Sequence, residues 1–159
     1  MSVIFACRVV RRAAEKPKEA ALLGLLEMDQ ETPLAGIRFL IIEDEIMQAL
    51  LLGEMLSDMG GIIVDTVYGY EQARNAVHEN VFDCAVLDIN LSGTLSFSIA
   101  EMLKNRGIPF VFCTAFADGV DAYPDALRTS WVDKPVQSEE LREAVLAALK
   151  AGKLAAEGR

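Results

Sequence analysis

Short apolar runs alternate with segments of helical periodicity along most of the chain. The apolar runs predict five strands, at residues 37–42, 62–67, 83–87, 109–113 and 131–133. Apolar residues near helical spacing predict four regular helices, at residues 46–59, 70–79, 96–105 and 138–150. Strands that alternate with helices are typical of βα units and a parallel sheet. The pattern therefore predicts an α/β fold built from five βα units.

The segment between the fourth and fifth strands interrupts this pattern. Residues 115–130 contain Gly119 and Pro124 and show little periodicity. Proline and glycine both disfavour a regular helix. We therefore expect a fourth helix that is short, irregular or mobile.

Two of the predicted helices indicate which of their faces would pack on the sheet. In helix 70–79 the expected inward residues are Ala73, Ala76 and Val77. In helix 46–59 a wider apolar stripe is expected to face inward, and its members are Met47, Leu50, Leu51, Met55 and Leu56.

The chain divides near Pro33 into an N-terminal extension, residues 1–35, and a domain, residues 36–151, followed by a C-terminal tail, residues 152–159. The extension lacks strand periodicity, but the stretch 18–28 carries apolar residues near helical spacing. One interpretation is an amphipathic helix that docks or makes a homodimer. The other is an accessory or partly disordered segment, even one upstream of a true start at Met28.

Composition and charge narrow the range of partners. A chain of 159 residues suffices for one domain with a sizeable core plus an extension. The net charge of −9 argues against a nucleic-acid partner, because binding to a phosphate backbone needs clustered Lys and Arg.

Neither a membrane span nor a secretory signal is expected. No window approaches the roughly 18 apolar residues of a membrane helix. The apolar stretch 3–7 precedes its arginines, whereas a signal peptide carries basic residues first. Cys7, Cys84 and Cys113 have no metal-type spacing and indicate core thiols in a reducing compartment. The predicted localisation is cytoplasmic.

Charged and hydroxyl side chains stand at the ends of four predicted strands. Glu43 and Asp44 follow the first strand, and Asp88 follows the third. Thr114 follows the fourth strand and Lys134 the fifth. Because open α/β sheets place their ligands at the carboxyl ends of the strands, we expect these side chains to form one site. Each acidic residue alone would be equally typical of a helix N-cap.

Three neighbouring carboxylates would repel one another unless a cation compensates their charge. Mg²⁺ suits this role, because it prefers oxygen ligands and keeps several waters. We expect Asp44 and Asp88 to bind it directly and Glu43 through water, with the backbone carbonyl of Asn90 as a further ligand.

With such an ion present, Asp88 can act as a nucleophile toward a phosphoryl group. Lys134 would supply a positive charge to one phosphoryl oxygen, and the Thr114 hydroxyl would donate a hydrogen bond to another. The product, an aspartyl phosphate, would pull on Thr114 and reorganise the segment behind it.

Taken together, these residues resemble the motif of the response-regulator receiver domain of two-component signalling. The resemblance runs from about residue 37 to residue 149 and includes Glu43-Asp44, Asp88, Thr114 and Lys134-Pro135 in order. It implies a flavodoxin-like doubly wound sheet with strand order 2-1-3-4-5, Mg²⁺ dependence and a histidine kinase or phosphotransfer protein as donor.

The segment 109–116 is also similar to the FATGUY type of stand-alone receivers. Cys113 and Ala115 depart from that type, standing where it has alanine and glycine. Two further departures from the family are the loop 90–92, which lacks the common proline, and Val136, where an aromatic residue often follows Lys-Pro.

Trp131 occupies the position where many receivers keep an aromatic residue that turns inward on phosphorylation. It is interpreted either as such a switch, together with Thr114, or as a partly buried indole that does not move.

The sequence thus predicts a single-domain response regulator that is phosphorylated on Asp88 and is not an enzyme beyond its own phosphorylation and dephosphorylation. Its output would be altered contacts with a downstream protein or removal of phosphoryl groups from a kinase. The alternative is a Mg²⁺-dependent phosphohydrolase with an aspartyl nucleophile. A degenerate receiver that binds partners without phosphorylation is the remaining possibility.

Overall fold

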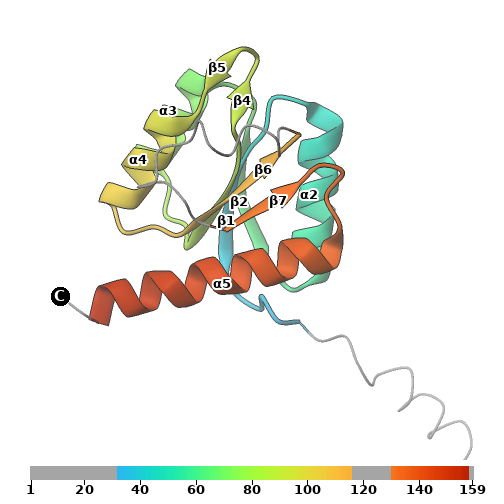
Figure 1. Ribbon diagram of the computed structural model, residues 1–159, viewed down its shortest axis with the longest axis vertical. Helices are drawn as coiled ribbons and strands as arrows, with labels where there is room; N and C mark the ends of the chain where they lie inside the picture. The colour runs from blue at the N-terminus through green and yellow to red at the C-terminus, as the bar shows by residue number, and fades with distance from the viewer. Residues whose placement is uncertain (1–31, 116–129, 158–159) are drawn as a thin grey trace, which may run out of the picture. The chain divides into compact units, whose positions relative to one another are not determined.

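The computed structural model describes residues 32–115 and 130–157 of the chain. In these residues the main strands are β1 (Arg38–Ile42), β2 (Ile62–Val67), β3 (Cys84–Asp88), β6 (Phe110–Thr114) and β7 (Ser130–Asp133). The helices are α2 (Ile46–Asp58), α3 (Tyr70–Glu79), α4 (Phe97–Asn105) and α5 (Ser138–Glu157), and a small hairpin is formed by β4 (Asn90–Leu91) and β5 (Thr94–Leu95) (Figure 1).

The five main strands form one parallel sheet in the order β2-β1-β3-β6-β7. This is the predicted flavodoxin-like order 2-1-3-4-5, and the α/β prediction is confirmed. Every residue of β3 and β6 is buried, which explains why both strands read as unbroken apolar runs. Strand β2 lies at one side of the sheet, and most of its residues are exposed or half-buried.

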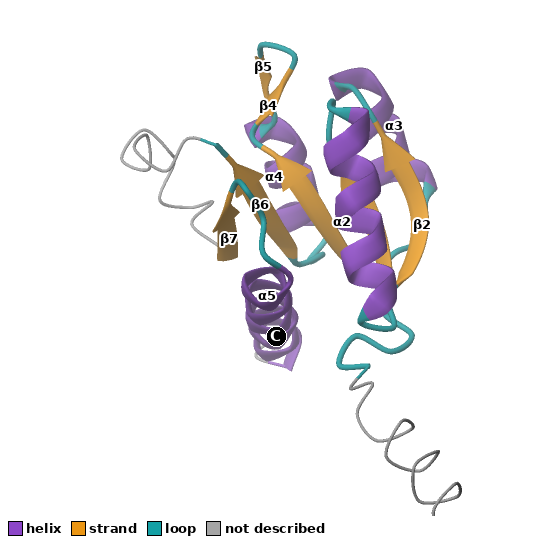
Figure 2. Ribbon diagram, turned by 90° about the vertical axis from the view of Figure 1, so that its right-hand side faces the viewer, coloured by secondary structure: helices purple, strands orange, loops and turns teal. Residues whose placement is uncertain are grey.

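Helices cover both faces of the sheet (Figure 2). Side chains of α3 and α4 pack with Leu40, Ala85 and Phe112 on one face. Side chains of α2 and α5 pack with Ile41 and Val86 on the other. Successive residues of a strand point to opposite faces, so each apolar run supplies both cores.

Helix α3 buries Ala73, Ala76 and Val77, as its sequence predicts. Cys84 and Cys113 are buried, and burial raises the pKa of each thiol to about 12. Both cysteines are therefore the inert core thiols that their spacing indicates. Cys7 lies outside the described residues.

Helix α2 packs on the sheet through a different face from the predicted one. The prediction is wrong for Met47, Leu50 and Leu51, which are 71%, 59% and 47% exposed. The buried residues of this helix are Ala49, Leu52 and Leu56. Apolar residues occur on every side of α2, so their spacing does not specify the face that packs on the sheet.

Two further differences concern the ends of predicted elements. Helix α5 continues to Glu157, so most of the segment expected to be a C-terminal tail is helical. The loop after β3 contains the antiparallel hairpin β4–β5, which projects beyond the end of β3 (Figure 2). Its turn residues Ser92 and Gly93 have φ values of 52° and 89°, the left-handed pair that a two-residue hairpin turn requires.

Two predictions fall outside the described residues. They are the irregular fourth helix, within residues 116–129, and the helix of the N-terminal extension, residues 18–28, with its proposed role in dimerisation. In the ranges that the structure describes, no helix combines the length and the apolar character that crossing a bilayer demands.

Candidate functional site

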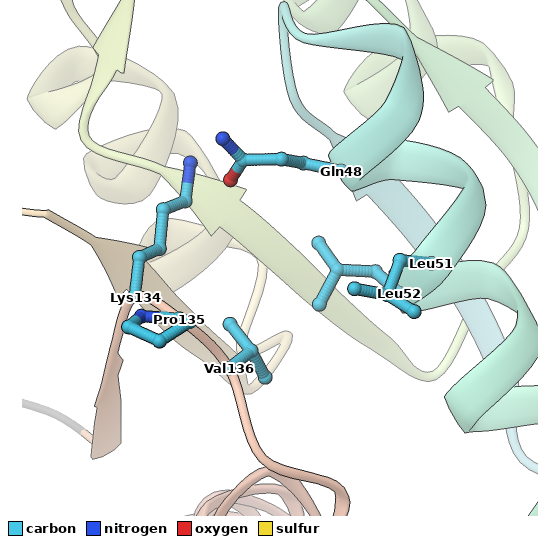
Figure 3. A pocket seen from close by; sticks show the side chains of 6 residues that line it. All are labelled: Gln48, Leu51, Leu52, Lys134, Pro135 and Val136. Carbon is cyan, nitrogen blue, oxygen red and sulfur yellow. The ribbon is translucent and has the colours of Figure 1, made fainter.

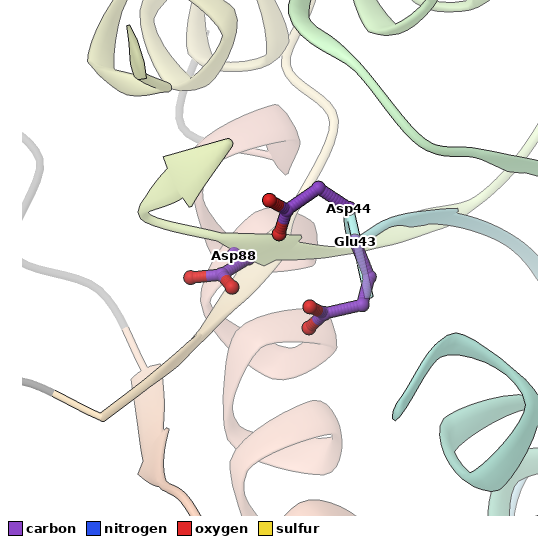
Figure 4. Close-up of side chains that lie close together, drawn as sticks. All are labelled: Glu43, Asp44 and Asp88. Atoms are coloured by element: carbon purple, nitrogen blue, oxygen red, sulfur yellow. The ribbon is translucent and has the colours of Figure 1, made fainter. Parts of the chain in front are cut away.

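The carboxyl ends of β1, β3 and β7 bring the predicted site residues together. Glu43 and Asp44 follow β1, Asp88 ends β3, and Lys134 follows β7. Glu43, Asp44 and Asp88 each offer a carboxylate oxygen, and these oxygens lie within 4.8 Å of one another. The three side chains face a common space at the edge of the sheet (Figure 4).

Lys134 connects two of the three carboxylates. Its ammonium Nζ donates to Glu43 Oε2 at 2.7 Å and to Asp88 Oδ2 at 2.6 Å. The side chains of Lys134 and Asp88 are both 11% exposed, and that of Glu43 is 1% exposed. These ion pairs are therefore shielded from water. Electrostatic interactions are stronger in such a buried environment than in water.

The charges of the described site do not balance, because three carboxylates lie together and the Lys134 ammonium group pairs with two of them. The pKa of Glu43 is raised to about 7, chiefly because its carboxyl group is buried; the hydrogen bond from Lys134 opposes this rise, and the charge of Asp88 adds to it. Burial also disfavours the charge of Lys134, but hydrogen bonds and charges from Asp88 and Glu43 outweigh it and raise the Lys134 pKa. The site therefore favours a further positive charge.

Asp44 takes its hydrogen bonds from the β4–β5 hairpin. The backbone N–H of Ser92 donates to Asp44 Oδ2 at 2.8 Å, and the Ser92 hydroxyl donates to the same oxygen at 2.7 Å. Ser92 is not among the site residues predicted from the sequence. The Ser-Gly pair between two short apolar stretches signals a tight turn, but the contact with Asp44 spans 48 positions of the chain.

The end of β3 is held by its own loop. The backbone N–H of Asn90 donates to Asp88 Oδ1 at 3.1 Å. The hydroxyl of Ser96, which is fully buried, donates to the Asp88 carbonyl at 2.6 Å. Ser96 is a second residue that the sequence did not single out. These bonds fix the backbone on which the Asp88 carboxylate stands.

Thr114 lies at the same edge. It is the last residue of β6, it is buried, and its carbonyl accepts the Lys134 backbone N–H at 2.8 Å. Trp131, on β7, is half-buried and packs against the core on the α3–α4 face of the sheet. Asn90 follows Asp88 by two positions, with its side-chain carbonyl accepting the Gly93 N–H. Thr114 and Lys134 are thus adjacent, whereas Trp131 lies three residues before Lys134 within β7; the individual roles of the predicted residues stay predictions.

The donor set fits Mg²⁺. All the acidic ligands offer oxygen, and oxygens on opposite sides of a Mg²⁺ ion lie roughly 4.2 Å apart. A spread of up to 4.8 Å is compatible with one carboxylate that reaches the ion through water, as predicted for Glu43. Glu43, Asp44 and Asp88 are therefore the residues that would hold the cation.

Comparison with known proteins decides the family. Residues 39–146 match the family described as response regulator receiver domain, over more than half of the chain. The chain belongs to the response regulator receiver family. In this receiver, Glu43, Asp44 and Asp88 form the acidic cluster typical of a phosphoacceptor site in two-component signalling.

Two curated relatives are similar over part of their length. The transcriptional regulatory protein TcrA of Mycobacterium tuberculosis is 31% identical over 112 residues, which cover 68% of this chain and 44% of TcrA. The two-component response regulator PhoP of Pseudomonas aeruginosa is 32% identical over 120 residues, which cover 72% of this chain and 52% of PhoP. The receiver spans about half the length of these relatives.

Two solved structures are similar over nearly their whole length. SdrG from Sphingomonas melonis Fr1 is 35% identical with a TM-score of 0.63, covering 72% of this chain and 96% of SdrG. A sensor protein from Polaromonas sp. JS666 is 25% identical with a TM-score of 0.66, covering 74% of this chain and 98% of that protein.

Proposed function

We propose that this receiver accepts a phosphoryl group on Asp88 from a phosphohistidine of a sensor histidine kinase or phosphotransfer protein. The observation that carries the proposal is that the Asp88 carboxylate contacts the Lys134 ammonium group and lies beside the acidic pair Glu43–Asp44. A carboxylate in this position can act as a nucleophile, while the groups around it bind the phosphoryl oxygens.

In the proposed transfer, a carboxylate oxygen of Asp88 forms a bond to phosphorus as the P–N bond of the donor breaks. The electron pair of that bond stays on the imidazole nitrogen. Lys134, which contacts Asp88 Oδ2, would move its charge onto a phosphoryl oxygen. The Thr114 hydroxyl, at the end of the neighbouring strand, would donate to another. A bound Mg²⁺ would supply further neutralising charge.

An exposed apolar surface beside the site supports a protein as the donor. Four exposed residues of α2 form it: Ile46, Met47, Leu50 and Leu51. A pocket of about 400 Å³ continues this surface between α2 and the segment after β7, where it reaches Lys134, Pro135 and Val136 (Figure 3). A donor protein with an apolar helical face would bury these residues and lie next to Asp88.

The proposal extends to a stand-alone receiver of the FATGUY type. The similarity to SdrG, 96% of which is covered by this chain, supports a protein that consists largely of a receiver. Phe112 and Thr114 match the type, whereas Cys113 and Ala115 differ from it. Its output would be a changed surface that binds a downstream protein, or drainage of phosphoryl groups from a kinase. Thr114 and Trp131 would respond to the new phosphoryl group on Asp88.

The test is phosphorylation of the full chain by acetyl phosphate, followed on phosphate-affinity gels and by intact mass. We expect labelling with Mg²⁺, none with EDTA and none in Asp88→Ala. Asp83→Asn, at the opposite edge of the sheet, is the matched acidic control and should label normally. Undiminished labelling of Asp88→Ala would refute the assignment.

The same preparation separates the alternatives. Continuous turnover of p-nitrophenyl phosphate that depends on Asp88 would favour the phosphohydrolase. Binding of a partner without any labelling would favour the degenerate receiver. Titration of Trp131 fluorescence with Mg²⁺ and beryllofluoride gives an independent measure of a conformational change at β7.

A further inference from the structure

The β4–β5 hairpin follows Asp88 and contacts Asp44 through its turn residue Ser92. Just before its turn, Leu91 is buried in the core shared with α3 and α4, and at its base the Ser96 hydroxyl holds the Asp88 carbonyl. At its turn, the Gly93 N–H donates to Asn90 Oδ1 at 2.8 Å. Because both its base and its turn are held, the tip of the hairpin has a defined position.

Ser92 at this tip donates both of its hydrogens to one oxygen. Its N–H and hydroxyl lie 2.8 and 2.7 Å from Asp44 Oδ2. A carboxylate oxygen has two lone-pair sites, so Oδ2 is fully hydrogen-bonded, whereas Oδ1 accepts no hydrogen bond within the part of the chain that the structure describes. The side chain of Asp44 is thereby oriented with one chosen oxygen open to a ligand.

The hydrogen-bond donors to Asp44 are neutral, whereas the Lys134 donor to Glu43 and Asp88 is positively charged. Lys134 places its positive charge on Glu43 and Asp88. Asp44 is held instead by an amide and a hydroxyl, which are neutral. Neutral donors orient a carboxylate without cancelling the negative charge that attracts a cation. Groups that hold metal ligands in this way commonly tune metal affinity by about 10- to 100-fold.

We propose that Ser92 is a positioning residue for the metal site, which holds Asp44 so that its Oδ1 faces the cation. The inference builds on the proposed function, since it takes Glu43, Asp44 and Asp88 as the Mg²⁺ site. The hairpin tip carries no acidic ligand of its own. The further inference is that the hairpin nevertheless sets the affinity of this receiver for Mg²⁺.

The test measures Mg²⁺ binding to the full chain by isothermal titration calorimetry, without any phosphodonor. Ser92→Gly removes the hydroxyl but keeps the N–H and accepts the positive φ of 52°. We expect its affinity for Mg²⁺ to fall about tenfold. Ser92→Asn, which tolerates this backbone conformation and offers an amide donor, should recover part of the loss. Thr94→Ala changes an exposed residue of the same hairpin and should bind like the wild type.

A second measurement separates positioning from a general defect. The rate of labelling by acetyl phosphate in Ser92→Gly should need more Mg²⁺ to saturate but should reach nearly the wild-type maximum. A merely structural role would lower the maximum without moving the Mg²⁺ dependence.

Several results would overturn the proposal. Equal or tighter Mg²⁺ binding by Ser92→Gly would refute the role of Ser92 alone, provided that the wild type binds and Asp44→Asn does not. Absence of Mg²⁺ binding by the wild type would refute the proposed metal site as well, so the two failures are distinguishable.

Discussion

The amino ends of the parallel strands (the amino edge) and their carboxyl ends (the carboxyl edge) both hold carboxylates, but in different electrostatic environments. At the amino edge, Arg38 donates its backbone N–H and its Nε to Asp83 Oδ2, both at 2.9 Å, and its terminal nitrogen to Oδ1 at 2.7 Å. One positive charge meets one negative charge, and the two side chains are 41% and 35% exposed. At the carboxyl edge, three carboxylates lie together, and the buried ammonium group of Lys134 pairs with two of them, Glu43 and Asp88.

The pKa values reflect this difference. Hydrogen bonds from Arg38 hold the pKa of Asp83 below its usual value. Burial raises the pKa of Glu43 to about 7. The charges at the amino edge therefore balance without a ligand. Those at the carboxyl edge balance only when another positive charge is added. This contrast locates the site on physical grounds that do not depend on the family.

The largest effect is expected when the carboxyl edge loses the ammonium group of Lys134. Lys134→Met leaves the buried carboxylates of Glu43 and Asp88 without a cationic partner. Removing one member of a buried ion pair costs about 3 kcal/mol or more. Urea unfolding at neutral pH in EDTA should show this loss, and added Mg²⁺ should restore part of it. An unchanged unfolding midpoint would contradict the proposed charge imbalance.

A smaller effect of opposite sign is expected from Glu43. Its pKa of about 7 in the folded protein exceeds the ordinary value of 4.5, so the folded protein holds this proton more tightly than the unfolded chain. Its contribution to stability is therefore fully present below about pH 4.5 and is lost as the pH rises through about 7. One linked proton corresponds to a fall of at most about 1.4 kcal/mol per pH unit.

Glu43→Gln removes this titration. In EDTA, above the pKa of Glu43, the variant should be more stable than the wild type, and its stability should depend less on pH. Urea unfolding as a function of pH checks both points. If the two proteins had the same pH profile, Glu43 would not be the group that titrates.

The smallest effect is expected at the amino edge. Asp83→Asn weakens an exposed ion pair, so the folding equilibrium should change by roughly fivefold or less. Since Arg38 lowers the pKa of Asp83, the stabilisation exists above the ordinary pKa of 3.8 and disappears as the pH falls below it. Binding of Mg²⁺ should be unchanged. A loss of Mg²⁺ affinity in this variant would break the contrast between the edges.

The sequence determines the strands and the placement of the reactive groups at their ends. The runs that became β3 and β6 are buried on both faces, so their apolar pattern is unambiguous. Asp88 ends one of these buried runs, and Lys134 follows the less buried strand β7; parallel pairing then carries both to one edge. Local pattern and the rules of parallel sheets were sufficient for this part of the site.

Only the tertiary structure decided which face of α2 is buried and which group holds Asp44. Met47 and Leu50 are as apolar as the buried Leu52, so spacing alone does not rank the faces, and the close packing of α2 on the sheet selects one. The bonds from Ser92 to Asp44 join segments 48 positions apart. Such contacts depend on how a hairpin leaves the sheet, and a linear pattern of polar and apolar residues does not encode that direction.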